Sequence, residues 1–449
     1  MQMARMQSSL TRNAPIFVAE KSGFQSLAYK KCLPGAACRR IAAWVSLILS
    51  LASMGCTVEA GFPSSLPAPP LPPPSGQVIQ VTTAGELFAA INRLESGGTV
   101  MIRAGDYLLD HPLVLDAKHN ITLRGETGRP EDVVIHGQGW DHPNQNEDLL
   151  HVARCDGVII ADLTFAEARS YGVKVEAENG PRNVHIRNCH FRNLGMRAIK
   201  GSAGQDPSVH AVNGSVRFCR FENTRVPPAD WLFDGDYISA IDMMALENWT
   251  FSDNTFLDIR GRNGGGRAAV FIWVRSRKII VERNVIVDCD RGIALGNPGV
   301  STANREGEVP VYVLDAVVRN NFIQGGADCG MELWYARNIR VLHNSICRPE
   351  QNWQRGIRVG TGSSDILIQN NLIHGNIRLD GGSAKETNNL VGQVDHCFAD
   401  ALHGDLSLNA AAVDALDKGT PHPEVTSDIR GQPRDATPDL GAWEHNTDR

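Results

Sequence analysis

The sequence lacks the excess of positive charge that a nucleic-acid-binding protein carries. Its 44 Lys and Arg residues are outnumbered by 50 Asp and Glu residues, which gives a formal net charge of −6. A nucleic-acid partner would require a clearly basic domain or stripe, so we expect none. Aromatic residues are also few, at 6% of the chain, whereas the 43 glycines are typical of a chain with many tight turns.

The ten cysteines show neither a zinc-binding nor a disulfide pattern. No pair has the CxxC spacing of a structural zinc site, and disulfide frameworks belong to much shorter secreted chains. Cys189 and Cys219 occupy equivalent positions in neighbouring repeats. We interpret them as stacked, buried thiols that pack as small hydrophobic side chains, with a disulfide between them as the alternative.

A membrane-spanning helix needs roughly 20 apolar residues, and the apolar run Ile41–Gly55 is shorter than that. Because it follows Arg39 and Arg40, it predicts an export signal. Two processing sites remain open: cleavage near Ala60, or a degenerate lipobox that places a lipid on Cys56. We therefore expect an exported protein, either periplasmic, secreted or an outer-membrane lipoprotein, whose only membrane contact would be the lipid at Cys56.

An eight-residue phrase recurs eight times along the chain. Its third residue is always apolar, its eighth is Phe or Ile, and its sixth is Asn in the last five copies. The copies are Val158–Phe165, Val184–Phe191, Gly214–Phe221, Trp249–Phe256, Ile279–Ile286, Ala316–Ile323, Ile339–Ile346 and Ile366–Ile373. The third positions are 23 to 37 residues apart, and their strand-like alternation predicts a solenoid of stacked coils.

The recurring Asn residues have a physical role in such a solenoid. They are Asn254, Asn284, Asn321, Asn344 and Asn371. An Asn that turns inward at a bend can bond the equivalent Asn one coil away, and ladders of identical residues stabilise stacked strands. We therefore expect an Asn ladder, in which Leu163, Cys189 and Cys219 take the same place in the earlier coils.

This repeat resembles the right-handed parallel β-helix proteins of the pectate-lyase-like superfamily, over residues 77–395. The resemblance implies an all-β fold. Thr83 and Glu86 form a capping box that predicts a short helix ahead of the first coil, where it would cover the open end of the core. A second short helix, over Leu408–Leu416, is expected to close the C-terminal end.

The expected organisation has four parts. They are an N-terminal extension with the export signal at 1–60, a Pro-rich linker at 61–76, the parallel β-helix at 77–395, and a C-terminal cap and tail at 396–449. A Pro-rich linker is extended and semi-rigid, so it would suit a tether between a membrane surface and the folded domain.

A second strand in each coil sends alternate side chains outward. One predicted outward row is Lys174, Lys200, Phe271, Ala294, Glu332, Arg358 and Arg378, and a parallel row is Glu176, Trp273, Trp334 and Asp380, with Arg275 just beyond Trp273. In the superfamily this face and its loops form the carbohydrate groove. We therefore expect Trp273, Arg275, Glu332, Trp334, Arg358 and Arg378 to bind substrate, because Trp stacks on sugar rings and Arg pairs with uronate carboxylates. Ordinary solvated charges are the alternative.

The resemblance also implies where chemistry would occur. Superfamily lyases use a Lys or Arg base and calcium held by acidic residues, so Lys200 and Lys174 are the expected bases. In the long connection Glu222–Asn248, the acidic residues Asp234, Asp236 and Asp242 are the expected calcium ligands, with local turns as the alternative. The lyase signature is incomplete, because Gly292–Gly296 is apolar where a second basic residue is expected.

The sequence therefore predicts an exported β-helix that binds or processes an extracellular, acidic polysaccharide. β-Elimination is the first specific reaction to consider. A glycoside hydrolase would need two facing carboxylates, for which Glu332 with Asp380 or Asp242 are the candidates. A carbohydrate-binding or adhesive solenoid without chemistry is the rival from another class, so the sequence leaves open whether the protein is an enzyme.

Overall fold

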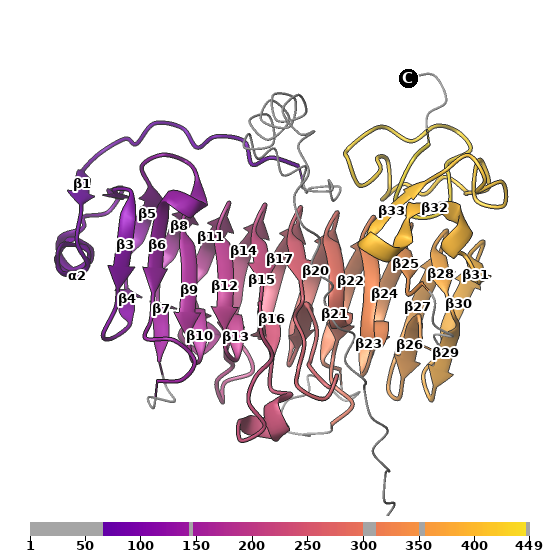
Figure 1. The fold of residues 1–449 in the computed structure, drawn as a ribbon, viewed down its shortest axis with the longest axis horizontal. Helices are drawn as coiled ribbons and strands as arrows, with labels where there is room; N and C mark the ends of the chain where they lie inside the picture. The colour runs from indigo at the N-terminus through magenta and orange to yellow at the C-terminus, as the bar shows by residue number, and fades with distance from the viewer. Residues whose placement is uncertain (1–65, 143–146, 300–310, 350–354, 446–449) are drawn as a thin grey trace, which may run out of the picture. The chain divides into compact units, whose positions relative to one another are not determined.

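A computed structural model describes residues 66–142, 147–299, 311–349 and 355–445. In this part of the chain the regular structure is nearly all β-strand, with one α-helix, α2 (Ala84–Arg93), and short 3-10 turns. The strands of the solenoid pair in parallel, coil upon coil (Figure 1). The predicted all-β parallel β-helix with an N-terminal capping helix is confirmed.

Each copy of the eight-residue phrase forms two strands with a sharp bend between them. The eight first strands, with three strands before them and one after them, make a 12-stranded sheet: β1 (Val78–Val81), β2 (Thr99–Ile102), β5 (His119–Gly125), β8 (Asp156–Ala161), β11 (Arg182–Arg187), β14 (Ala211–Arg217), β17 (Leu246–Ser252), β20 (Ser276–Glu282), β22 (Val313–Arg319), β24 (Ala336–Leu342), β27 (Ser364–Gln369) and β30 (Ala384–Thr387). The fifth residue of every copy has a positive φ, as at Arg283 (φ 51°) and Asn370 (φ 58°). This left-handed residue makes the bend.

The strands after the bend form a second stack. It contains β3 (Gly105–Leu108), β6 (Val133–His136), β9 (Thr164–Ala168), β12 (His190–Leu194), β15 (Arg220–Glu222), β18 (Thr255–Leu257), β21 (Val285–Leu295), β23 (Phe322–Leu333), β25 (Ser345–Cys347), β28 (Leu372–His374) and β31 (Leu390–Gly392). Phe165, Phe191, Phe221 and Phe256 stack in its interior, with ring centroids 5.4, 4.8 and 4.7 Å apart.

The second strand predicted for each coil forms a third stack. It contains β4 (Leu113–Asp116), β7 (Asp148–Ala153), β10 (Tyr171–Val175), β13 (Arg197–Gly201), β16 (Ser239–Met244), β19 (Val270–Trp273), the C-terminal parts of β21 and β23, β26 (Ile357–Gly360) and β29 (Ile377–Asp380). Because β21 and β23 run through both stacks, the two stacks join into one 19-stranded sheet.

The Asn ladder is present as predicted. The side-chain amide of Asn254 donates to Asn284 Oδ1 at 3.0 Å, that of Asn284 donates to Asn321 at 2.9 Å, and that of Asn321 donates to Asn344 at 2.9 Å. Asn371 continues the ladder to Asn389. Cys189 and Cys219 are buried free thiols, which confirms their interpretation as packed hydrophobic side chains.

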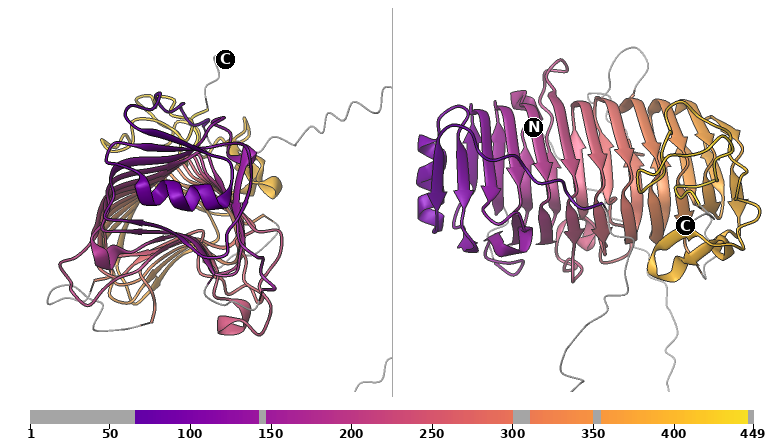
Figure 2. Two further views of the ribbon diagram at one scale, coloured as in Figure 1. Left: turned by 90° about the vertical axis from the view of Figure 1, so that its left-hand side faces the viewer. Right: turned by 90° about the horizontal axis from the view of Figure 1, so that it is seen from above.

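The N-terminal end of the solenoid is covered by α2. The backbone amide of Glu86 donates to Thr83 Oγ1 at 3.2 Å, so Thr83 is the N-cap that the sequence predicts. Leu87, Ala90 and Ile91 lie buried on one side of the helix and join the main core. Figure 2 shows the helix lying across the end of the coils.

The C-terminal tail does not close the opposite end. No helix forms over Leu408–Leu416 in the described chain, where residues 409–416 make turns after β33 (Asp405–Leu408), so this expectation is wrong. The tail packs instead on the flank of the solenoid: Leu406 and Leu440 lie in one cluster with Phe322 of the second stack. Tail residues therefore bury the outer side of the last coils rather than their end.

The described part of the Pro-rich linker, Leu66–Gly76, lies against the first sheet. Arg124 donates to the carbonyl of Pro72 at 3.1 Å, and Arg187 donates to that of Pro69. The predicted export signal, lipobox and cleavage site lie outside the described residues. Within the described residues, no helix has the length and apolar character needed to cross a membrane.

Candidate functional site

The outward side of the third stack, which we call the charged face, carries the predicted row in register. Lys174 pairs with Lys200, Glu332 with Arg358, and Arg358 with Arg378. Sequence alone misses two members of this row: His151 beside Lys174, and Asp242 between Lys200 and Phe271. The expectation of one loop from Glu222 to Asn248 is wrong, because β16 lies within it and presents Asp242 on the face.

Asp242 is the centre of a buried ion cluster. Its Oδ2 atom accepts from Arg197 Nε at 2.7 Å and from Lys200 Nζ at 3.0 Å, and its Oδ1 atom accepts from Trp273 Nε1 at 3.0 Å. Asp242 is 2% exposed and Arg197 1%. Burial by itself would raise the pKa of Asp242, but the Lys200 ammonium and the Arg197 guanidinium lower it to about 2.

The two expected bases have different surroundings. Lys200 is buried, and its ammonium is bound to Asp242. Because this ion pair occupies its ammonium group, the geometry does not leave Lys200 free to act on a substrate proton. Lys174 is half-buried, with Nζ 3.9 Å from Glu176 Oε1. The same carboxylate contacts His151 at 3.0 Å.

Trp334 is not the exposed stacking platform that the sequence predicts. It is only 7% exposed, and the Arg358 guanidinium lies over its ring at 4.7 Å. Its Nε1 atom donates to Glu332 Oε2 at 3.1 Å. Glu332 is itself 3% exposed and lies 3.5 Å from Arg291. The expected exposure of Trp334 and Glu332 is therefore wrong, because neighbouring side chains of the face cover both residues.

Trp273 and Arg275 also make internal contacts. Trp273 is half-buried and stacks on Phe271, with ring centroids 5.3 Å apart. Arg275 does not extend the row, because it lies in the turn after β19 with φ 56° and is 3% exposed. Its guanidinium donates to the carbonyl of Gly204 at 2.8 Å. The expectation that Arg275 faces a ligand from the row is therefore wrong.

Three residues at the C-terminal end of the face form an accessible ion group. Arg378 is exposed, and its Nε atom donates to Asp380 Oδ1 at 2.7 Å. Arg358 is half-buried and contacts the other oxygen of Asp380. Burial opposes the charge on Asp380, but hydrogen bonds from Arg378 and Arg358 lower its pKa overall. Neither Asp380 nor Asp242 therefore has the raised pKa that a glycosidase acid requires.

The three expected calcium ligands are not brought together. Asp242 is bound to cations on the face, whereas Asp236 accepts from the backbone amide of Asn263 at 2.9 Å in a loop. Asp234 lies in the turn Leu232–Gly235 with φ 55°. Among the described residues, no group of three or more His, Cys, Asp or Glu side chains is arranged to hold a metal ion. Calcium stays a prediction without a ligand set.

Arg267 is a further residue at the face that the sequence pattern does not single out. It belongs to residues 258–269, a further long connection, which joins β18 to β19. Its guanidinium is half-buried and lies 5.8 Å from the ring centroid of Phe271. Among the described residues its guanidinium has neither a hydrogen-bond acceptor nor an ion-pair partner within bonding distance. Burial lowers the pKa of Arg267 and the nearby guanidinium groups of Arg291 and Arg197 lower it further, whereas the carboxylates of Glu332 and Asp242 partly oppose this shift.

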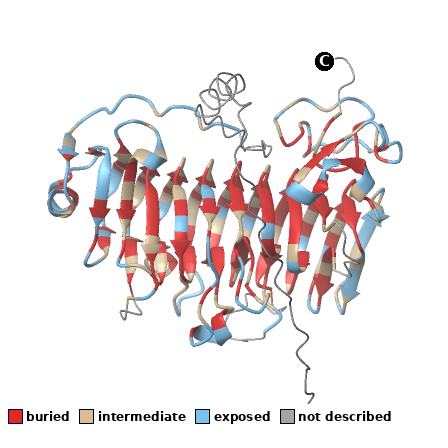
Figure 3. Ribbon diagram, viewed as in Figure 1, coloured by how far each residue is buried: buried red, intermediate tan, exposed pale blue. Residues whose placement is uncertain are grey.

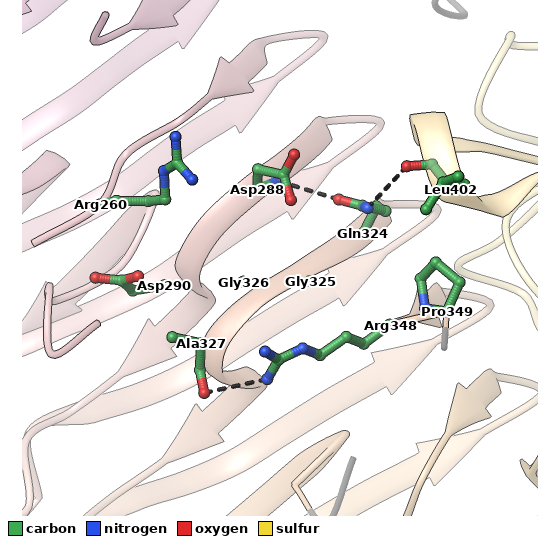
Figure 4. Close-up of a pocket in the computed structure, with 10 residues that line it drawn as sticks. All are labelled: Arg260, Asp288, Asp290, Gln324, Gly325, Gly326, Ala327, Arg348, Pro349 and Leu402. Carbon is green, nitrogen blue, oxygen red and sulfur yellow. Dashed lines mark hydrogen bonds between the residues drawn. The ribbon is translucent and has the colours of Figure 1, made fainter. Parts of the chain in front are cut away.

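The loop that carries Arg267 is anchored by Asp290. Asp290 Oδ2 accepts from the backbone amides of Gly261 at 2.7 Å and Gly266 at 2.9 Å. Its burial raises its pKa. Asp290 also lines a cavity of about 350 Å³ beside the loop, with Asp288, Arg260 and Arg348 around it (Figure 4). In the sequence, the run of glycines at 264–266 just before Arg267 is the feature that could have indicated a tightly turned loop here.

One protein-family model matches the chain. The family model described as the right-handed β-helix region matches residues 144–373, just over half of the 449 residues. The chain therefore belongs to the right-handed β-helix family. A search of curated proteins found no match.

Solved structures with a similar fold are distant from this chain. An alginate lyase from Paenibacillus sp. str. FPU-7 is 14% identical, with a TM-score of 0.44, and the match covers 70% of this chain and 98% of that chain. The pectate lyase Pel9A is 11% identical, with a TM-score of 0.46, and the match covers 83% of this chain and 97% of that chain. An exopolygalacturonase from Thermotoga maritima is 13% identical, with a TM-score of 0.41, and the match covers 67% of this chain and 80% of that chain. Sequence identities and TM-scores this low do not indicate the substrate or the reaction of this chain.

Proposed function

We propose that the protein binds an acidic polysaccharide along the charged face, with Arg267 as a contact for a uronate carboxylate. The observation that carries this proposal is the half-buried Arg267 guanidinium, which no described carboxylate contacts within bonding distance. The nearest charges of opposite sign, those of Glu332 and Asp242, already pair with other side chains. A guanidinium out of bulk water gains most from a carboxylate, which it can bind with two parallel hydrogen bonds.

The charges around Arg267 favour an anionic ligand. Arg197 and Lys200 share one carboxylate, that of Asp242, so this part of the face has more cations than anions. Arg291 does not add to this excess, because Asp328 binds it at 2.5 Å and Glu332 lies 3.5 Å from it. A ligand carboxylate at Arg267 would offset this excess without leaving a buried charge unpaired.

The shape of the face favours a linear polymer over a small anion. Adjacent coils lie about 4.8 Å apart, and accessible cations continue in both directions, at Lys174 toward the N-terminus and at Arg358 and Arg378 toward the C-terminus. A chain with regularly spaced carboxylates could contact several of them at once. Trp273, which is half-buried beside Phe271, offers partial apolar surface for a sugar ring.

β-Elimination remains the reaction to test at this site. It needs a cation on the uronate carboxylate, which Arg267 could supply, and a base for the neighbouring proton. Because Asp242 holds the Lys200 ammonium, the geometry supports recognition of a carboxylate more directly than removal of a proton. Unsaturated products absorb in the ultraviolet, so turnover of polyuronates with and without calcium separates a lyase from a binding protein.

The binding proposal is tested with Arg267→Gln. We expect polyuronate affinity to fall about 10- to 100-fold, which corresponds to loss of one charged hydrogen-bonded contact, while binding of a neutral polysaccharide is unchanged. The matched control is Lys278→Gln, which removes one positive charge from the first sheet, where Lys278 pairs with Glu247. Titration calorimetry at low and high salt provides the measurement, and the parent affinity should weaken as salt rises.

Two outcomes would count against this function. If Arg267→Gln and Lys278→Gln reduce binding equally, the effect is one of net charge and the face is not the site. If the parent protein binds neutral and acidic polymers with the same affinity, carboxylate recognition by Arg267 is wrong.

A further inference from the structure

The last coil of the solenoid is an edge in all three stacks. β29 pairs only with β26, β30 only with β27, and β31 only with β28. No described residue pairs with the other side of these strands. Figure 3 shows the contrast, with buried strands through the middle of the solenoid and exposed residues at this end. An unpaired edge offers backbone groups to another strand.

The edge also exposes apolar side chains that an additional coil would cover. Leu379 in β29 is 48% exposed, and Val391 in β31 is 39% exposed. At the other end, α2 buries the equivalent apolar surface. The described part of the tail contacts the side of the last coil, where Asn388 Nδ2 donates to the carbonyl of Lys418 at 2.7 Å. Among the described residues, no strand covers the end surface.

We propose that this end is the contact between two copies of the protein, in which β29 pairs antiparallel with β29 of the second copy. The pairing is centred on Leu379, so that the two leucines face each other across a twofold axis. Arg378 then lies opposite Asp380 of the second copy, and Asp380 opposite Arg378 of the second copy. Opposite charges in facing positions stabilise an antiparallel pair.

The order of charges in β29 is what favours a second copy as the partner. A twofold interface must be complementary to itself, and the Ile377–Asp380 strand meets that condition because a basic and an acidic residue flank Leu379 symmetrically. Within one copy, Arg378 and Arg358 bind different oxygens of Asp380. Asp380 therefore keeps Arg358 as a partner when Arg378 turns toward the second copy.

Crosslinking through Leu379→Cys in the full chain tests the pairing. Residues that face each other in an antiparallel pair have Cα atoms about 4.5–5.5 Å apart, which suits a disulfide. We expect mild oxidation to convert most of this variant into a covalent dimer. Val413→Cys is the control, because Val413 is 64% exposed but lies on the tail, and it should crosslink no more than the unaltered protein.

Light scattering after gel filtration provides the second measurement. The unaltered protein should form a dimer as its concentration rises, and Leu379→Lys should raise the dissociation constant about 100-fold, because it places two like charges on the axis. Circular dichroism should show both variants folded, since Leu379 is half exposed. A protein that stays monomeric without crosslinking would overturn the proposal. So would a dimer that survives Leu379→Lys and does not crosslink at position 379.

Discussion

The Asn ladder and the charged face are two sides of the same coils, but they use repetition in opposite ways. At the ladder, the same side chain recurs from Asn254 to Asn389, and each one bonds the next. On the charged face, the residue changes from coil to coil along most of the row, as where Lys200, Asp242 and Phe271 follow one another in register. Repeated positions hold the solenoid together, whereas unrepeated positions distinguish this protein from other solenoids.

The two sides also differ in how their polar groups are compensated. Ladder amides are neutral, and each donor finds an acceptor one coil away. The face buries charge, and Asp242 alone compensates two cations there. Removing a buried partner from an ion cluster leaves an unpaired charge, which costs more than a lost neutral hydrogen bond. Substitutions at the two sides should therefore change the free energy of unfolding by different amounts, and these changes should depend differently on pH.

The largest effect is expected for Asp242→Asn. It leaves Arg197 and Lys200 buried without a counter-charge, and we expect the free energy of unfolding to fall by about 3–5 kcal/mol. Urea unfolding measures this change. Asp365→Asn, at an exposed position of β27, is the control and should change little. A loss below 1 kcal/mol at Asp242 would contradict its role in the cluster.

The next effect is expected for Asn321→Leu. It removes the bond to Asn344 and the acceptor of Asn284, both at 2.9 Å. Because these groups are buried, we expect a loss of about 1–3 kcal/mol, read from the same unfolding curves. Asn389→Leu, at the half-buried last rung, should cost less. Equal losses of unfolding free energy at the two positions would mean that a rung inside the ladder stabilises the protein no more than its last rung.

The charged face and the Asn ladder should also differ in how their contributions to stability respond to acid. Asp242 has a folded pKa of about 2, below the value of about 3.9 expected in an unfolded chain. Its contribution is therefore present above about pH 3.9 and is lost as the pH falls through about 2, since the unfolded chain then binds more protons. Unfolding free energies measured between pH 5 and pH 2 should decline less steeply for Asp242→Asn than for the parent. Parallel declines would rule out a depressed pKa at Asp242.

The smallest effect is expected for Arg378→Gln, at the exposed end of the same face. Asp380 keeps Arg358 after the change, and exposed ion pairs contribute little. We expect a change within about 0.5 kcal/mol in thermal or urea unfolding of dilute protein. A loss as large as that of Asp242→Asn would show that burial is not what distinguishes the middle of the face from its end.

The fold could be predicted because its determinants recur. Asn at the bend, an apolar third residue and a Phe or Ile at the eighth position repeat often enough for their register to be read, and the helix before the first coil has its own capping signal at Thr83. The tail has no such repetition. Its apolar residues, such as Leu406 and Leu440, indicate burial but not whether they cover the end or the flank.

The candidate site could be predicted only in part, for a related reason. Alternation places Lys200, Glu332 and Arg358 in one row, but it does not reveal what covers them. Trp334 is buried by Arg358 from the next coil, and Arg267 reaches the face from a loop of irregular length. Contacts between different coils and loops depend on side-chain packing, which periodicity does not encode.

The ladder register has a consequence for how such a chain can change in evolution. Residues 255–284 span one coil, from the position after Asn254 to Asn284. Removing them would join Asn254 to Val285 and place Asn254 where Asn284 now meets Asn321. The remaining coils would keep their register, and the loss would be confined to what that coil carries, including Arg267. Whole-coil deletion or duplication can thus alter the ligand-contacting residues of a lineage without requiring a new fold.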